Sequence, residues 1–160
     1  MAVAACTKDD ESMKFDIREI FVNACKNNEI EKVIFICDSL NLNVNTKSRS
    51  GGRSGLVDAA VNNSEDVVAW LLAQPGIQVN MVADDDTALT AACRAGHPDI
   101  VRRLVRAPDV NYNWQDRYGL TAAHWAAMKS AACVEVLAEA RGYPTTKYEI
   151  GAAEIHTVKT

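Results

Sequence analysis

A short pattern of small residues recurs along this chain at nearly constant spacing, and it constrains the fold more than any other feature. The pattern is centred on Ala24, Ala59, Ala92 and Ala126, which are separated by 35, 33 and 34 residues. A fixed period in this range indicates a stacked repeat array, in which each repeat buries its apolar side against its neighbours. The length of 160 residues fits one domain, and a hydrophobic content of 48% is sufficient for its core.

The last copy, DRYGLTAAHWAA at residues 116–127, shows the pattern most completely. Gly119 permits the positive φ of a turn. Thr121 follows at a position where its hydroxyl can cap a helix by accepting from a free backbone amide. The paired alanines at 126 and 127 then leave one helix face small enough for a neighbouring helix to approach closely. We therefore interpret the unit as a turn that leads into a helix.

The copies resemble the ankyrin-repeat family over roughly residues 18–142. The residues that carry the resemblance are Thr121, His124 and Ala126 in the last copy, and Thr87, Leu89 and Ala92 in the one before it. The resemblance implies an all-α fold, an ankyrin-repeat solenoid of about four helix-turn-helix repeats with short β-hairpin loops.

The predicted organisation has three parts: a flexible N-terminal segment at 1–15, an ankyrin-repeat domain at 16–142, and a C-terminal tail or capping helix at 143–160. The repeats lie near 16–46, 47–80, 81–113 and 114–142. Apolar residues at helical spacing predict pairs of helices near 17–27 and 29–39, 55–63 and 65–73, 88–95 and 98–107, and 122–129 and 132–140.

Two departures from the repeat pattern lead to specific expectations. One residue is missing between the helices of the fourth repeat, where Ser130 and Ala131 replace Gly96 and His97. The second connector carries Asp85 where the family prefers glycine, so we expect its tip to be distorted.

The net charge and the cysteine content restrict the binding partners and the cellular compartment that we expect for the protein. The net charge of −4 disfavours non-specific binding to nucleic acid or to an anionic membrane, and no apolar run reaches membrane-spanning length. The five cysteines are odd in number and form no C-x-x-C pair, which is typical of a reducing compartment. We therefore expect a cytoplasmic or nuclear protein.

No set of residues predicts catalysis. The resemblance implies that His124 hydrogen-bonds the loop backbone, and we interpret His97 as a turn residue in the same way. Cys93 and His97 are four residues apart on one helical face, but structural zinc requires four ligands. No glycine-rich phosphate loop follows a predicted strand. We therefore predict that the protein is not an enzyme and that it uses no metal or cofactor.

The surface remains as the candidate functional feature. In ankyrin proteins the first helices line a concave face beside the hairpin loops, and this register places Trp125 outward on that face. Tyr118 either contacts a partner or covers the hairpin beside Gly119. Trp, Tyr and Arg side chains dominate the energetics of protein interfaces. The candidate partner-binding residues are Trp125, Trp114, Tyr118, Tyr112, Arg117, Met128, Lys129, Arg94, Asp58 and Asp85.

The resemblance therefore predicts a non-catalytic protein–protein interaction module, a scaffold or regulatory binding protein. Its partner would be another protein, with no nucleic acid and no membrane, and the chain would be a monomer or would self-associate weakly. The alternative is a regulatory ankyrin fragment of a larger enzyme or channel that docks intramolecularly or self-associates through an open C-terminal face. A third hypothesis is that Asn45, Asn80 and Asn113 are substrates of an asparaginyl hydroxylase, as similar repeats can be.

Overall fold

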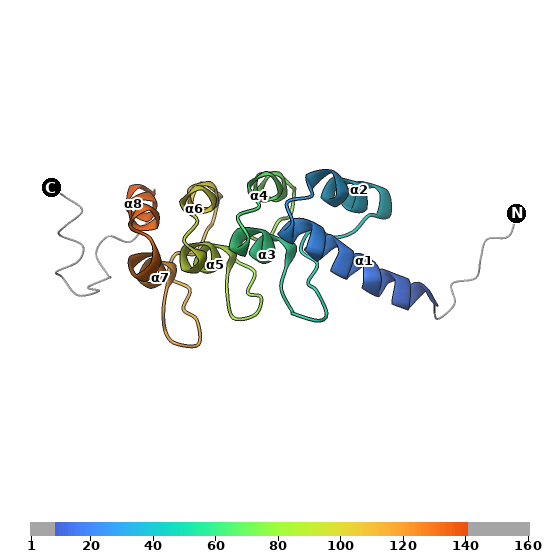
Figure 1. Cartoon of the computed structure of the whole chain (residues 1–160), viewed down its shortest axis with the longest axis horizontal. Helices are drawn as coiled ribbons and strands as arrows, with labels where there is room; N and C mark the ends of the chain where they lie inside the picture. Colours follow the sequence, from blue (N-terminus) through green and yellow to red (C-terminus); the bar gives the residue numbers. More distant parts are fainter. Residues whose placement is uncertain (1–8, 141–160) are drawn as a thin grey trace, which may run out of the picture.

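A computed structural model describes residues 9–140 of the chain, and their side chains from residue 17 onward. The described part of the chain forms eight helices, which stack as four successive pairs (Figure 1). The pairs are α1 (Asp9–Lys26) with α2 (Ile30–Leu40), α3 (Gly55–Val61) with α4 (Glu65–Leu72), α5 (Ala88–Ala95) with α6 (Pro98–Leu104), and α7 (Ala122–Lys129) with α8 (Ala131–Glu139). The predicted all-α repeat solenoid is confirmed.

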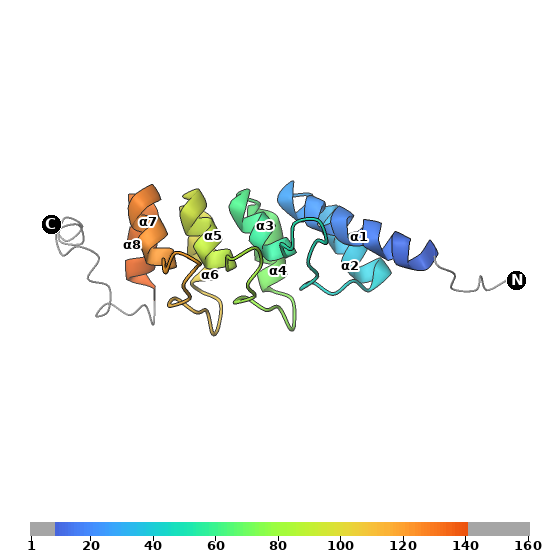
Figure 2. The same cartoon turned by 90° about the horizontal axis from the view of Figure 1, so that it is seen from below.

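The helices lie in two rows. The first helices α1, α3, α5 and α7 form one row, and the second helices α2, α4, α6 and α8 form the other (Figures 1 and 2). Three loops project to the same side as the first row, and we call them finger 1 (residues 41–54), finger 2 (73–87) and finger 3 (105–121). We call the surface made by the first row and the fingers the concave face.

Local sequence signals set the ends of most helices. Ser54 and Thr87 cap α3 and α5 by accepting hydrogen bonds from the amides of Val57 and Thr90. Gly96 ends α5 with a φ of 79°, a conformation in which glycine carries no steric cost. In the last repeat Ser130 is both the C-cap of α7 and the N-cap of α8, whereas the third repeat uses Gly96 and His97 for these two positions. The connection between α7 and α8 is therefore one residue shorter.

A column of apolar side chains on the second helices packs between the layers. Val67, Ile100 and Cys133 are fully buried at the position that faces the preceding layer, whereas their counterpart in the first repeat is the exposed Lys32. A terminal layer has no preceding neighbour, so a polar residue is tolerated there. The exposed positions of the first repeat are not all polar, however, because the apolar Ile20 and Phe35 are also exposed, Phe35 at 62%.

The loops contain almost no sheet. Within residues 9–140 there is no strand, and the antiparallel bridges Lys47–Ser54 and Ala83–Asp86 stand alone. Asparagine side chains tie each loop to the next instead. Asn45 Nδ2 donates to the Gly76 carbonyl at 2.9 Å, and its Oδ1 accepts from the Gln78 amide at 2.8 Å. Asn80 repeats this arrangement one layer on, with the Asp109 carbonyl and the Asn111 amide.

The start of the first helix differs from the prediction. Helix α1 begins at Asp9 rather than near Ile17, so it runs through part of the segment that we expected to be loose. Residues 9–16 contain neither proline nor glycine, so no backbone feature interrupts the helix on that side. The predicted tail at 143–160 lies outside the described residues.

Candidate functional site

The structure sorts the ten predicted binding residues by exposure. Tyr118 and Met128 are 73% and 57% exposed. Arg117 and Lys129 are also exposed, while four others are half-buried: Trp125, Trp114, Arg94 and Asp85. Tyr112 and Asp58 are buried. The exposed members lie on α7 and finger 3, at the C-terminal half of the concave face.

Trp125 is held in place by contacts on two sides. Its indole Nε1 donates a hydrogen bond to Asp116 Oδ2 at 2.8 Å, which connects α7 to finger 3. The guanidinium of Arg94 on α5 lies 5.8 Å from the centre of the ring, within the range of a cation–π contact. Arg94 is in turn paired with Asp86 of finger 2. Trp125 therefore joins three elements of two repeats, and it packs partly against the core.

Asp116 organises finger 3 around this tryptophan. Its Oδ1 accepts from the backbone amides of Tyr118 and Leu120, both at 2.9 Å. Partial burial would raise the pKa of Asp116, but the hydrogen bonds from Leu120, Trp125 and Tyr118 outweigh it and hold that pKa below its ordinary value. The carboxylate is thus charged at neutral pH and fixes the orientation of the indole.

The three consecutive aspartates of finger 2 each pair with an arginine from a different element. Asp84 pairs with Arg53 of finger 1 at 3.0 Å, and Asp86 pairs with Arg94 of α5. Asp85 accepts from both the backbone amide and the Nε of one arginine of finger 3, at 2.9 and 2.6 Å. That residue is the predicted binding residue Arg117. Finger 2 is therefore linked to both neighbouring fingers and to the helix row.

The pKa values of Asp85 and Asp86 are shifted in opposite directions, although each acid is paired with an arginine. The side-chain hydrogen bond from Arg117 lowers the pKa of Asp85, which lies near the surface. Burial raises the pKa of Asp86, although Arg94 opposes this effect. Within the described residues, Asp86 Oδ1 is buried without a hydrogen-bond partner. A charge on Asp86 is therefore less favourable than one on Asp85 despite the adjacent arginine.

The tip of finger 2 keeps a tight turn without glycine. Asp84 and Asp85 have φ values of 53° and 64°, and Ala83 and Asp86 exchange backbone hydrogen bonds across them. Aspartate tolerates the left-handed region better than most residues. The expected distortion is thus limited to two aspartates in a conformation that glycine or asparagine would adopt more easily.

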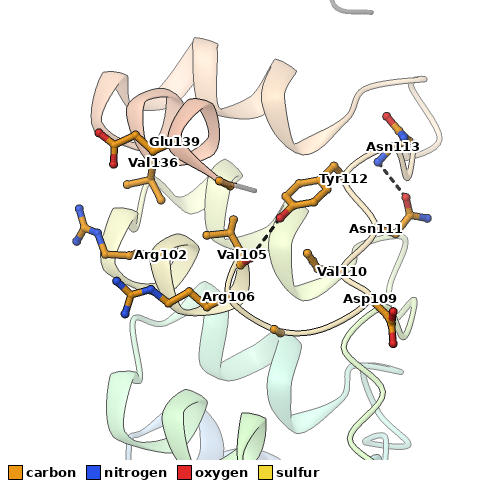
Figure 3. A pocket seen from close by; sticks show the side chains of 12 residues that line it. Arg102, Val105, Arg106, Asp109, Val110, Asn111, Tyr112, Asn113, Val136 and Glu139 are labelled. Atoms are coloured by element: carbon orange, nitrogen blue, oxygen red, sulfur yellow. Dashed lines mark hydrogen bonds between the residues drawn. The ribbon is translucent and has the colours of Figure 1, made fainter. Parts of the chain in front are cut away.

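The structure corrects the placement of Tyr112. Its side chain is only 9% exposed, and its hydroxyl donates to the Val105 carbonyl at 3.2 Å (Figure 3). It lies under finger 3 beside Val110, on the wall of an open groove of about 820 Å³ between α6, α8 and this finger. The sequence register alone does not distinguish a loop residue that points outward from one that packs inward.

The structure also corrects Asp58. This residue, expected at the surface of the concave face, is 9% exposed and lies 3.4 Å from Arg53 Nη1. Burial raises its pKa, which Arg53 partly offsets. The neighbouring position in the same column, Ala91, is completely buried. In this column Asp58 and Ala91 are therefore buried, whereas Trp125 is half-buried.

His97 and His124 occupy structural positions, as predicted. His124 Nδ1 accepts from the Thr121 amide at 3.1 Å, and His97 Nε2 lies 3.0 Å from the Val61 carbonyl of the preceding repeat.

Burial raises the pKa of the Cys25 and Cys93 thiols, so neither is suited to act as a nucleophile. Among the residues that the structure describes, no three His, Cys, Asp or Glu side chains are grouped to hold a metal ion.

No helix in the part of the chain covered by the structure is long and apolar enough to cross a membrane.

The repeat geometry agrees with a comparison against known families. Residues 75–148 match the family model described as ankyrin repeats (3 copies). The chain therefore contains ankyrin repeats. Ankyrin repeats are generally protein–protein interaction modules, and ankyrin-repeat domains are typically non-catalytic.

Four charged residues of this ankyrin-repeat surface were not among the predicted binding residues. Three of them contact predicted residues, namely Arg53 with Asp58, Asp86 with Arg94 and Asp116 with Trp125, and the fourth, Asp84, pairs with Arg53. A signal for two of the links was present in the sequence. Asp84 follows Arg53 by 31 residues and Arg117 follows Asp85 by 32, so each pair is separated by nearly one repeat. Opposite charges one period apart lie on adjacent layers of a stacked array.

Proposed function

We propose that this ankyrin-repeat chain is a non-catalytic module that binds another protein through the C-terminal half of its concave face. The binding surface consists of the exposed Tyr118, Met128 and Lys129 around the half-buried Trp125. The observation that carries the proposal is the fixed indole, which Asp116 and Arg94 hold beside large apolar side chains that face solvent.

The composition of this surface is typical of an interface centre. Aromatic residues, Met and Arg are enriched at protein interfaces, and a few such residues supply most of the binding energy. Met128 follows Trp125 by three residues on α7, so the two share one helix face. Neither the Met128 nor the Tyr118 side chain packs in the core, so core packing does not explain why a large apolar residue stands at either position.

The proposal is tested by comparative affinity capture from an extract of the source cells. The bait proteins are the wild-type chain and the double variant Tyr118→Ser/Met128→Ser, which changes exposed side chains and leaves the Trp125 contacts intact. We expect a protein that is captured by the wild type and lost by the variant. With a purified partner, the dissociation constant should rise about 30-fold, equivalent to about 2 kcal/mol.

Phe35→Ser is the matched control, because Phe35 is an equally exposed large apolar residue on α2, outside the proposed surface. This variant should retain the partner. Equal capture by all three proteins, with folding verified by circular dichroism, would contradict the proposed surface.

A further inference from the structure

Two large apolar side chains are exposed on the outer side of the first repeat, which we call the N-terminal end of the stack. Ile20 on α1 is 43% exposed, and Phe35 on α2 is 62% exposed. In the later repeats the same two positions face the preceding layer, and most of their residues are buried. They are Gly55, Ala88 and Ala122 for Ile20, and Trp70, Arg103 and Val136 for Phe35. A terminal repeat usually carries a polar outer face, and this one does not.

The outer side of the fourth repeat, the C-terminal end, is the counterpart of this surface. Val134 is half-buried and Ala127 is exposed, whereas their equivalents in the first three repeats are completely buried. These equivalents are Val33, Val68 and Val101 for Val134, and Cys25, Ala60 and Cys93 for Ala127. Cys25 faces Gly55 of the following repeat, so the column of Ala127 faces the next layer. The C-terminal end thus exposes small apolar residues where the other layers receive a neighbour.

The sizes of the facing residues match between the two ends. Inside the stack, the contact between successive first helices combines one large and one small residue. Phe21 faces Gly55, and the equivalent pairs are Leu56 with Ala88 and Leu89 with Ala122. The series leaves Ala123 and Ile20 at the two ends of the described repeats. Together they again combine a large and a small residue, which keeps the volume at the contact close to that of the inner pairs.

We propose that the N-terminal end of one chain packs on the C-terminal end of a second copy and continues the stack. A second copy is the favoured occupant, because the three interfaces between the described repeats already join these two kinds of surface. Ile20 of one copy lies against Ala123 and Ala127 of the other. The concave partner-binding surface is not involved. Because the two ends differ, the contact is head-to-tail and leaves a free end at each side, so it builds open chains.

Sedimentation equilibrium of the full chain at increasing concentration tests for this association. The weight-average mass should rise beyond that of two chains, because a head-to-tail contact does not close. A mass that stays at one chain up to about 1 mM, or that levels off at two chains, would overturn the proposal. Val82→Ser is the matched control, since Val82 is an exposed apolar residue of finger 2, away from both ends, and this variant should assemble like the wild type.

Two blocking variants test the direction of the contact. Phe35→Glu blocks the N-terminal end, because the new carboxylate would meet Glu135 and Glu139 of the other copy, the equivalents of the two arginines that line the groove with Val136. Ala127→Arg blocks the C-terminal end, because it places an unpaired charge in an apolar contact. Each variant alone should remain a single chain at concentrations where the wild type assembles.

A mixture of the two variants is the decisive measurement. Each variant retains one unmodified end, and these two ends are complementary, so the equimolar mixture should reach the mass of two chains and no more. An association between like ends would let one variant dimerise alone, and a mixture that stays at one chain would show that the ends do not meet; either result would overturn the proposal. Both positions are exposed, and circular dichroism verifies folding. Ile20→Glu blocks the same end as Phe35→Glu and replaces it if that variant does not fold.

Discussion

Gly55 opens α3 beside Phe21 and Cys25 of the first repeat, and replacing it with alanine tests how closely the layers are packed. A Cβ atom at this position would lie 2.8 Å from both Cys25 Sγ and Phe21 Cε1. Both of these side chains are fully buried, so they have little room to move. The equivalent residues in the next two layers, Ala88 and Ala122, are alanines, so the position itself is compatible with a methyl group.

The difference between the layers lies in the residue that faces this position. Phe21 occupies it in the first repeat, whereas Leu56 and Leu89 occupy it in the second and third. The larger ring therefore requires the glycine. Inserting a methyl group into a full core costs about 1–3 kcal/mol, and replacing glycine with alanine in a helix recovers about 0.5–1 kcal/mol. We expect Gly55→Ala to lower the free energy of unfolding by about 1 kcal/mol.

A double-mutant cycle provides the decisive measurement. Phe21→Leu alone should cost roughly 1–2 kcal/mol through lost volume, but together with Gly55→Ala it recreates the Leu–Ala contact of the later layers. We expect a favourable coupling of about 1 kcal/mol between the two changes. Urea unfolding should be followed by circular dichroism and by tryptophan fluorescence, because coincident transitions are needed before a single free energy is assigned.

Gly51→Ala provides the control for this cycle. Its Cβ would meet Ser48 Oγ at an ordinary 3.4 Å, and we expect a change of less than about 0.5 kcal/mol. Additive effects of Phe21→Leu and Gly55→Ala, or a stabilising Gly55→Ala, would show that the interface has spare room and would refute the reasoning.

Three further perturbations test other parts of the structure. Leu104→Ala removes a fully buried side chain between layers and should cost about 2–5 kcal/mol in urea unfolding, while a loss below about 1 kcal/mol would contradict the stacked register. Trp125→Phe removes the indole donor to Asp116 and should lower the free energy of unfolding by about 0.5–1.5 kcal/mol, whereas unchanged thermal stability would mean that this hydrogen bond contributes nothing. The backbone hydrogen bond from Ser50 lowers the pKa of Glu19, and the side-chain hydrogen bond from Arg117 lowers the pKa of Asp85. The stabilisation that these two carboxylates give the folded state is complete above their ordinary pKa values of 4.5 and 3.8, and it is lost as the pH falls through their lowered pKa values. Thermal melts between neutral and acidic pH should show this loss, and Asp85→Asn should reduce the pH dependence; an unchanged slope would remove Asp85 from the explanation.

Much of the fold could be predicted from the sequence because its determinants are local. Helix N-caps such as Ser54 and Thr87 act over a few residues, and the apolar column of Val67, Ile100 and Cys133 repeats at a fixed period through the second, third and fourth layers. The role of His124 was predictable for the same reason, since it bonds the amide of Thr121 three residues earlier. The α1 start was not predicted, because the repeat pattern begins later in the sequence.

The candidate site was harder to predict, because exposure depends on what covers a residue rather than on its register. Asp58 and Trp125 occupy the same column, yet Asp58 is buried and Trp125 is half-buried beside solvent. Tyr112 was assigned to the surface of finger 3, but its hydroxyl finds the Val105 carbonyl inside the repeat. The conformation of each finger decides these cases, and it depends on contacts between residues about 30 positions apart, such as Arg53 with Asp84.

These cross-finger contacts also explain why half-buried residues belong in the proposed binding surface. A solvent-screened ion pair such as Asp85–Arg117 adds little to stability. It does restrict finger 3, and through Asp116 it restricts the indole of Trp125. Ordering a flexible side chain on binding costs about 0.5–1.5 kcal/mol. Folding has already ordered the Trp125 side chain, so this side chain loses less conformational entropy when it contacts a partner. Weak pairs between the fingers would therefore contribute more to binding than to stability.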